Sequence, residues 1–272
     1  MDRIGIIAGG GILPLLIGKN LISKNYSISF FCIKNFVNVN DYKKYDFSEV
    51  DIRSFASILS SLKSKNIDKI VMVGKVSRPS IKDIKFDLNT LSLIKDFFLE
   101  SKGDDQLLKV ISIFFKKKGY PLFDWKSVCQ DLFASCDHLT ILKPSQIAYK
   151  NLKKGLDTFK TIGKADLGQS IIIQNQLILG VESIEGTDEL IKRCADYKRK
   201  QDRGILLKLS KYNQHNVLDL PAIGIKTLLN IKHYLYEGLF IEKNECIILE
   251  KEKIINFCNE NNLFLSTIKK ID

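Results

Sequence analysis

Residues 4–14 read IGIIAGGGILP, an apolar run followed by three consecutive glycines and then a proline. The run RIGIIA (3–8) has the composition of a buried strand, and the residues after the glycines, to about Lys24, have the pattern of a helix. A glycine loop between a first strand and a helix brings backbone N–H groups to the carboxyl edge of a sheet, where they can hold an anion. The alternative is a tight turn in which one or two glycines need a positive φ.

The usual nucleotide-binding fingerprints do not fit this loop. Gly9 and Gly11 supply the first two glycines of G-x-G-x-x-G, but Pro14 occupies the third position. The stretch GKN (18–20) lacks the leading glycine and the hydroxyl of a Walker A loop. A nicotinamide-dependent oxidoreductase therefore stays an alternative that rests on the glycine loop alone.

The first half of the chain alternates strands with amphipathic helices. The patterns predict strands at 27–33 and 69–76 and helices at 52–64, 88–100 and 106–118. Such alternation is typical of a parallel sheet with helices on both faces. We expect an α/β fold whose amino-terminal domain is Rossmann-like.

The second half has a different, α+β pattern. It predicts a helix at about 145–161, a hairpin around Asn175-Gln176, a helix at 187–200, a strand GILLKLS, a helix at about 225–236, a second hairpin LFIEKNECIILEK and a final strand NLFLSTI. Pro144 disfavours helix at the residue before it and marks a boundary. We expect an amino-terminal domain at 1–133, a linker at 134–143 and a carboxy-terminal catalytic domain at 144–272, with a ligand cleft between the domains.

Composition narrows the classes of partner. The 272 residues carry a formal charge of +11, which suits an anionic partner, although a general preference for Lys, Asn and Ile is enough to make the chain basic and explains the charge better than a dedicated nucleic-acid face. There is no arginine-rich run and no basic stripe interleaved with aromatics, so we expect no nucleic acid. Six cysteines without a CxxC pair indicate buried thiols in a reducing compartment. With no secretory signal and no apolar run of about 18 residues, we expect a cytoplasmic protein.

Three polar motifs are candidates for binding. GKVSRP (74–79) puts Lys75 and Arg78 at the sheet edge where the glycine loop ends, and both can bind phosphate oxygens. GDDQLL places Asp104 and Asp105 ahead of a helix, where they are either functional or helix caps. EGTDEL (185–190) is an acidic turn entering a helix and has the same two interpretations.

Asp219, in VLDLPAIG (217–224), is the strongest candidate for a functional residue. Apolar residues flank this carboxylate, and it precedes the next helix by too many residues to be a simple N-cap. Burying a carboxylate is costly unless it is paired or binds a metal. The three histidines lie far apart and show no i, i+4 pair, which argues against a histidine zinc site. The remaining hypothesis is that carboxylates act on a phosphate group together with a hard metal ion such as Mg²⁺.

Taken in order, AGGGILP, GKVSRP, GDDQLL, LGQS, ESIEGTDELIKR and LDLPAIG resemble the UDP-2,3-diacylglucosamine pyrophosphatases of lipid A synthesis over nearly the whole chain. The resemblance implies Mg²⁺-dependent attack of water on the α-phosphorus of an acylated UDP-sugar, which yields UMP and 2,3-diacylglucosamine 1-phosphate. It also implies peripheral contact with the cytoplasmic face of the inner membrane, where basic surface is drawn to anionic lipid.

The resemblance further implies which residues form the site. Asp219 matches the essential aspartate, as metal ligand or as the group that orients water. The positions that match substrate-contacting motifs are Gly10, Gly11, Ile12, Leu13, Lys75, Arg78, Asp104, Asp105, Gln169, Glu185, Thr187, Asp188 and Lys208.

The segment before Asp219 departs from the family pattern. Tyr212, His215 and Val217 stand where the family usually has proline, an acid and arginine. This departure motivates an alternative of another class, a non-catalytic protein on the same fold that binds a nucleotide sugar or a lipid.

Overall fold

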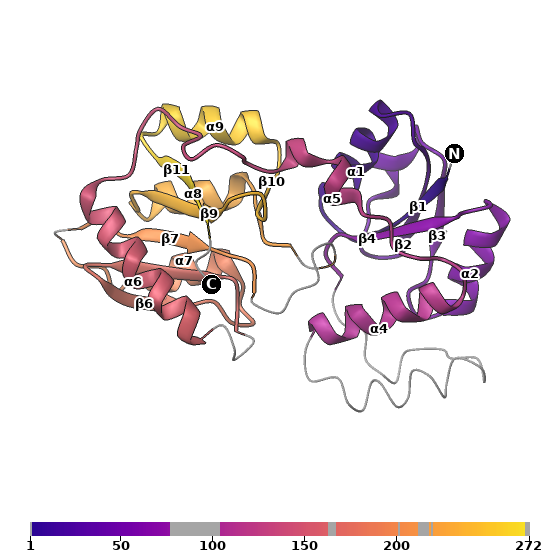
Figure 1. Ribbon diagram of the computed structural model, residues 1–272, viewed down its shortest axis with the longest axis horizontal. Coiled ribbons are helices and arrows are strands. Elements are labelled where there is room, and N and C mark those ends of the chain that lie inside the picture. Colours follow the sequence, from indigo (N-terminus) through magenta and orange to yellow (C-terminus); the bar gives the residue numbers. More distant parts are fainter. Residues whose placement is uncertain are drawn as a thin grey trace. The chain divides into compact units, whose positions relative to one another are not determined.

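The computed structural model describes residues 2–76, 104–162, 167–200, 202–211, 218 and 220–269, with the backbone alone at 104–107. The chain divides into two compact units (Figure 1). Unit 1 comprises residues 1–129 with 216–218, and unit 2 comprises 130–215 with 219–272.

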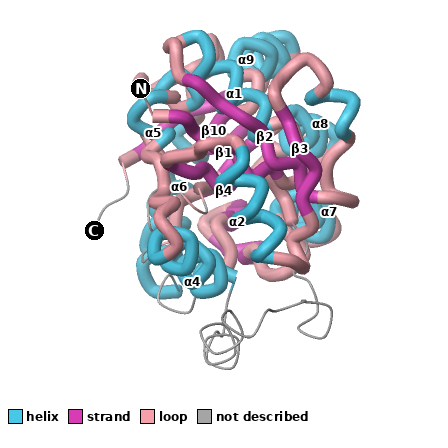
Figure 2. The backbone as a smooth tube through the Cα atoms, turned by 90° about the vertical axis from the view of Figure 1, so that its right-hand side faces the viewer, coloured by secondary structure: helices cyan, strands magenta, loops and turns pink. Residues whose placement is uncertain are grey.

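Unit 1 is built on a four-stranded parallel sheet with the strand order β3-β2-β1-β4 (Figure 2). The strands are β1 (Arg3–Ala8), β2 (Ser27–Ile33), β3 (Phe47–Val50) and β4 (Lys69–Val73). Five of the six residues of β1 are buried, as expected for a central strand covered on both faces. The parallel sheet predicted from the alternating pattern is confirmed, whereas the short edge strand β3 was not predicted.

Helices cover both faces of this sheet. On one face α1 (Leu13–Ser23) approaches so closely that a Cβ on Gly18 would meet the Phe30 ring at 2.2 Å. The other face packs against α2 (Phe55–Ser64) and α4 (Asp104–Lys117), whose Phe55, Phe114 and Phe115 form one aromatic cluster. The short elements η1 (Val39–Tyr42) and α5 (Trp125–Val128) also belong to the unit. The helix expected at 88–100 lies outside the described residues.

Unit 2 is built on a five-stranded mixed sheet with the order β11-β9-β7-β5-β6. Its strands are β5 (Ser170–Gln174), β6 (Leu177–Val181), β7 (Ile205–Lys208), β9 (Gly238–Glu242) and β11 (Phe264–Ile268). Strands β7, β9 and β11 run parallel, and β5 is antiparallel to both β7 and β6. Asn175 and Gln176 both have positive φ, so the predicted first hairpin is confirmed with a two-residue turn.

Helices again pack on both faces. The helix α6 (Gln146–Ile162) covers one face through Ala148, Leu152 and Phe159. The other face packs against α7 (Thr187–Ala195), α8 (Ile225–His233) and α9 (Lys251–Glu260). η3 (Gln130–Leu132) opens the unit. None of the described helices is both long enough and apolar enough to cross a membrane.

The second predicted hairpin is wrong. β10 (Ile247–Ile248) does not pair with β9, although a turn at Asn244 connects them. It pairs in parallel with β8 (Ala222–Ile223) instead. Two apolar runs around a polar turn cannot reveal which strand each run will pair with, because that depends on neighbours distant in sequence.

Residues 134–143, predicted as a linker, are part of unit 2. Leu139 N donates to the Leu265 carbonyl (3.0 Å) and Thr267 N donates to the Asp137 carbonyl (2.8 Å). These bonds attach the segment to the outer edge of β11. Pro144 therefore precedes α6 without separating two domains.

Candidate functional site

Two of the three glycines after β1, Gly9 and Gly10, serve the packing of the chain on itself. Gly9 N donates to the Val73 carbonyl, and Gly10 exchanges two 2.8 Å hydrogen bonds with Lys75. The amides of Gly9 and Gly10 are therefore already paired, contrary to the expectation that they are free to hold an anion. A Cβ on Gly9 would meet the backbone of Gly74 and Lys75 at 2.8 Å, so no larger residue fits there without movement.

Gly10 and Gly11 differ in what surrounds them. A Cβ on Gly10 would lie 2.9 Å from the Phe36 carbonyl oxygen, again a contact with the chain itself. Gly11 has a φ of +93° and nothing within 4 Å of its Cβ position. The turn with a positive φ is thus confirmed at Gly11, and contact of the loop with an anion stays a prediction that only this glycine has the open space to fulfil.

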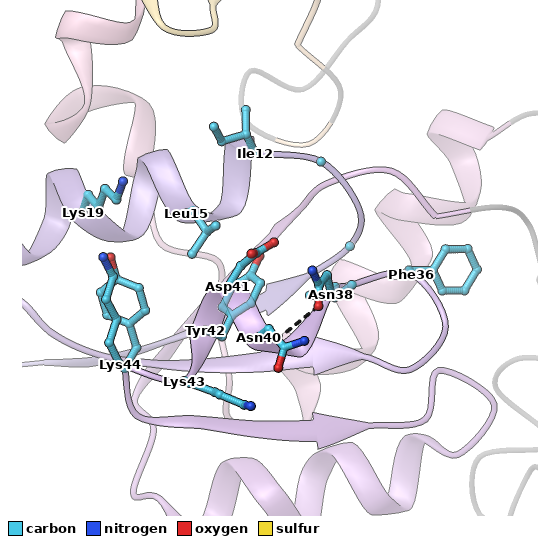
Figure 3. A pocket seen from close by; sticks show the side chains of 14 residues that line it. Ile12, Leu15, Lys19, Phe36, Asn38, Asn40, Asp41, Tyr42, Lys43 and Lys44 are labelled. Atoms are coloured by element: carbon cyan, nitrogen blue, oxygen red, sulfur yellow. Dashed lines mark hydrogen bonds between the residues drawn. The ribbon is translucent and has the colours of Figure 1, made fainter.

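Gly11 opens onto a pocket of about 840 Å³ at the carboxyl ends of β1 and β2 (Figure 3). One wall comes from the glycine loop and α1, and the other from the connection after β2. The pocket is lined by Gly9, Gly11, Ile12, Leu15, Lys19, Phe36, Val37, Asn38, Asn40, Asp41, Tyr42, Lys43, Lys44 and Tyr45. Ligands of parallel α/β sheets bind at this edge.

The lining of this pocket is mixed, with three lysines and one carboxylate among apolar side chains. Asn38 caps η1 by accepting a hydrogen bond from Asn40 N (3.2 Å), which shapes the wall opposite α1 (Figure 3). Tyr42 is 1% exposed, and its buried hydroxyl has no hydrogen-bond partner among the described residues. Burial, with Cys32 and Asp41 nearby, raises the pKa of the Tyr42 hydroxyl, so this group stays a neutral donor.

The other predicted residues of unit 1 are only partly placed. Ile12 lines the pocket, and Leu13 begins α1 behind it. Lys75 is exposed, and its backbone forms the bridge with Gly10. Arg78 lies outside the described residues, and Asp104 and Asp105 form the start of α4, where the backbone alone is described.

A buried polar network occupies the carboxyl end of β7 in unit 2. Lys208, the last residue of β7, is only 5% exposed. Its Nζ donates to Thr187 Oγ1 (2.6 Å) and to Ser170 Oγ (3.2 Å). Both hydroxyls are within 3.2 Å of each other, so the ammonium lies against a pair of oxygens.

Glu182 completes this network. Thr187 Oγ1 donates to Glu182 Oε1 (3.0 Å), and Glu182 Oε2 lies 3.8 Å from Lys208 Nζ. Oε2 itself is buried and accepts no hydrogen bond from the part of the chain that the structure describes. A buried carboxylate oxygen that is half-satisfied in this way has capacity for one more donor or cation.

Two of the predicted site residues of unit 2, Thr187 and Lys208, are thus in direct contact. Asp188 follows Thr187 in the first turn of α7, where it accepts from Thr227 Oγ1 (3.2 Å) and pairs with Lys226 (3.2 Å). Gln169 precedes Ser170, and its carbonyl accepts from Leu209 N (2.8 Å). This bond fixes the chain as it leaves β7.

Glu185 has a different role from Thr187. Its carboxylate pairs with Arg193 of α7 (2.8 Å), which holds the pKa of Glu185 below its usual value. Glu185 also accepts from Ser183 N (3.2 Å), so it organises the turn before α7. The structure places it in this turn and not in the Lys208 network.

A second carboxylate, Glu242, lies at the carboxyl end of the neighbouring strand β9. It is 8% exposed and accepts two 2.7 Å hydrogen bonds from the backbone N and hydroxyl of Ser210. Burial, opposed by Lys208, raises the pKa of the adjacent Cys246 thiol to about 12. Among the described residues, this end of the sheet therefore carries the buried Lys208, the buried Glu242 and the partly buried Glu182.

Asp219, the candidate metal ligand, lies outside the described residues, as do Tyr212, His215 and Val217. The described chain stops at Lys211, just past the network, and resumes at Leu218 and then at Leu220 and Pro221. Pro221 accepts from Ile247 N (2.8 Å). Within the described ranges, no three His, Cys, Asp or Glu side chains are placed to hold a metal ion.

The sequence reasoning missed Ser170, Glu182, Ser210 and Glu242. Ser170 and Glu182 fall within or beside the motifs LGQS and ESIEGTDELIKR, but nothing in their spacing distinguishes them from their neighbours. Burial identifies them, because polar side chains at strand ends are informative only when they are enclosed.

Comparison with known proteins matches both halves of the chain. The family described as LpxI N-terminal domain matches residues 3–132, and the family described as LpxI C-terminal domain matches residues 136–266. A relative from Caulobacter vibrioides, UDP-2,3-diacylglucosamine pyrophosphatase LpxI, is 26% identical over 272 residues, which is 97% of each chain.

Similarity to two solved structures is too distant to carry an argument. A phosphoribosylglycinamide synthetase from Anaerococcus prevotii is 12% identical with a TM-score of 0.24, over 73% of this chain and 43% of that one. A UDP-glucose 4-epimerase from Thermus thermophilus, in complex with NAD, is 10% identical with a TM-score of 0.30, over 98% of this chain and 85% of that one. The two LpxI domain families, by contrast, follow one another along nearly the whole sequence. The chain belongs to the LpxI family.

Proposed function

We propose that this protein hydrolyses UDP-2,3-diacylglucosamine to UMP and 2,3-diacylglucosamine 1-phosphate, as a Mg²⁺-dependent enzyme of lipid A synthesis at the cytoplasmic face of the inner membrane. One observation carries the proposal: both LpxI domains match in order, and a relative named for this pyrophosphatase activity aligns over 97% of each chain.

The reaction is a phosphoryl transfer to water. The water oxygen bonds to the α-phosphorus, and the bond from that phosphorus to the bridging oxygen breaks. The bridging oxygen leaves with the electron pair on the acylated sugar phosphate, and the water releases a proton. Because such a transition state carries spread negative charge, positioned cations contribute most of the rate.

The Lys208 network supports a phosphate chemistry in unit 2. Its ammonium is enclosed with Thr187 and Ser170, and interactions of a charge in such a site are less screened than in water. The neighbouring carboxylate oxygen of Glu182 has room for another partner. In this proposal Lys208 and Thr187 contribute to the substrate site. Gln169, Glu185 and Asp188 hold the surrounding chain in position.

The pocket of unit 1 supports binding of an anionic group. Lys19, Lys43 and Lys44 line it together with Gly11 and Ile12 at the start of α1. No described side chain caps the N-terminus of this helix, so its positive end adds to the lysines. Because of these positive charges, we assign Gly11 and Ile12 to the substrate site. We assign to Gly10, Leu13 and Lys75 the role of holding the loop around it in position.

Mg²⁺ and Asp219 enter the proposal through the chemistry of the substrate and the resemblance described above. The described residues do not by themselves form a metal site. A divalent ion would neutralise diphosphate charge, and Asp219 is the residue assigned to hold it or to orient water. Arg78, Asp104 and Asp105 remain assigned to the substrate.

The test is release of UMP from purified UDP-2,3-diacylglucosamine dispersed in detergent, with Mg²⁺ or with excess chelator. We expect release with Mg²⁺ only, and a loss of at least about 100-fold in Asp219→Ala, as for removal of an essential catalytic group. Glu252→Ala, an exposed carboxylate on α9, is the matched control and should retain full activity.

Three results would contradict parts of this proposal. Undiminished release in Asp219→Ala would remove the role of that carboxylate, and release in chelator would remove Mg²⁺. Tight substrate binding without turnover would establish the non-catalytic binding protein instead.

A further inference from the structure

The segment that enters α6 exposes apolar side chains to solvent. Ile141 is 85% exposed, and Ile147, in the first turn of α6, is 47% exposed. Between them Leu142 is 38% exposed. Single exposed apolar residues are ordinary, but a group within one short segment marks a contact surface.

This exposure is not the result of a loosely held loop. Ile141 N donates to Asn259 Oδ1 (2.9 Å), and the Thr140 hydroxyl donates to the Leu142 carbonyl (2.9 Å). The same hydroxyl accepts from Leu265 N (2.9 Å), which attaches the segment to β11. The backbone is thus fixed to the sheet in a conformation that directs Ile141 into solvent.

Lysines surround these apolar side chains. Lys143, Lys150, Lys153 and Lys154 are all exposed, and in the described part of the chain no carboxylate forms an ion pair with any of them. The helix α6 runs along the sheet of β5, β6 and β7 (Figure 1). One side of it packs into the core of unit 2, so only the other side faces outward. We name Ile141, Lys143, Ile147, Lys150, Lys153 and Lys154 the α6 face.

We infer that the α6 face docks on the surface of an anionic lipid bilayer. Unneutralised lysines are complementary to anionic headgroups, and exposed isoleucines can enter the boundary between headgroups and acyl chains. The aliphatic stems of the lysines can enter the same boundary while their ammonium groups remain in water. A nucleic acid is disfavoured, because this face has no arginine and isoleucine offers no stacking surface for a base.

The inference specifies where unit 2 meets the membrane in which the substrate of the proposed function resides. It does not depend on catalysis. Hydrolysis of substrate in detergent without vesicle binding would overturn the inference alone, and vesicle binding without hydrolysis would contradict the proposed function alone.

The experiment is flotation of the whole chain with two kinds of vesicle, phosphatidylcholine alone and phosphatidylcholine mixed with phosphatidylglycerol. Two variants address the face, Lys150→Gln with Lys154→Gln and Ile141→Ser with Ile147→Ser. Two controls alter exposed residues elsewhere, Lys116→Gln with Lys117→Gln on α4 and Leu177→Ser with Ile184→Ser in unit 2. Thermal unfolding of each variant verifies that it is folded.

We expect the wild type to bind the mixed vesicles and to lose binding as salt is raised. The lysine variant should bind the mixed vesicles about tenfold or more weakly, because each lysine near an anionic surface contributes several-fold to partitioning. The isoleucine variant should lose at least about fivefold through lost apolar burial. Both controls should bind like the wild type.

Equal binding to both vesicles, or equal losses in the face variants and their controls, would overturn the assignment. Absence of binding to either vesicle would also overturn it, and would leave an acidic protein as the partner that fits the lysines.

Discussion

The ammonium of Lys208 lies 2.6 Å from the hydroxyl of Thr187, although the two residues belong to a strand and a helix 21 positions apart in sequence. The Thr187 hydroxyl in turn donates to Glu182. A buried cation, a hydroxyl and a carboxylate therefore form one chain of contacts at the carboxyl end of β7. Removing one member leaves each group that it contacted with one partner fewer.

The first prediction concerns this network. Lys208→Met should destabilise unit 2 by about 3–5 kcal/mol, because Glu182 is left as an uncompensated buried carboxylate. The double variant with Glu182→Gln should recover part of that loss. Lys226→Met, which removes a 75% exposed lysine, should change stability by less than about 1 kcal/mol. Urea denaturation followed by circular dichroism measures all three, and equal losses in both lysine variants would refute the prediction.

The second prediction concerns the glycine loop. Gly9→Ala should destabilise unit 1 by about 1–3 kcal/mol, because the added methyl would meet backbone atoms of Gly74 and Lys75. Gly119→Ala, at a φ of +92° with open space around it, reports the cost of the backbone conformation without a clash. Thermal denaturation of Gly9→Ala, Gly119→Ala and Gly11→Ala separates the cost of a steric clash from the cost of the backbone conformation. Gly11→Ala should behave like Gly119→Ala, and a larger loss would show that its surroundings are not open.

The third prediction is a pH dependence. Burial lowers the pKa of Lys198 to about 8, with Arg203 adding to the effect. The unfolded chain then binds more protons than the folded one between about pH 8 and the ordinary lysine value, so stability should rise with pH across that range. Lys198→Met should remove this part of the rise. Urea midpoints of both proteins at a series of pH values test it, and parallel curves would exclude Lys198 as the cause.

The fourth prediction concerns thiol reactivity. Of the six cysteines, Cys136 alone is exposed, and the other five are buried. Burial raises the pKa of Cys32, Cys246 and Cys258 to about 12, so these thiols lack reactive thiolate at neutral pH. An aromatic disulfide reagent should therefore titrate one thiol in the native protein and six after denaturation. Cys136→Ser should abolish the native reaction, and rapid reaction of a second thiol would contradict the burial pattern.

Several features of this protein were determined by local sequence. The apolar runs at 3–8 and 27–33 and the amphipathic stretches between them predict the parallel sheet of unit 1, because a strand covered on both faces needs an uninterrupted apolar sequence. The turn at Asn175 and Gln176 likewise predicts the hairpin of β5 and β6. The order of short motifs along the chain was enough to recognise the LpxI family.

Other features were decided only by the tertiary structure. Strand pairing depends on distant neighbours, which is why β10 joins β8 and not β9. Only burial distinguishes Glu242 from the many exposed acidic residues, and burial is a property of the packed chain. The glycine loop shows the same division. The sequence shows only that three consecutive residues lack side chains. The fold places Gly9 and Gly10 in contact with the chain itself and leaves Gly11 open to a pocket.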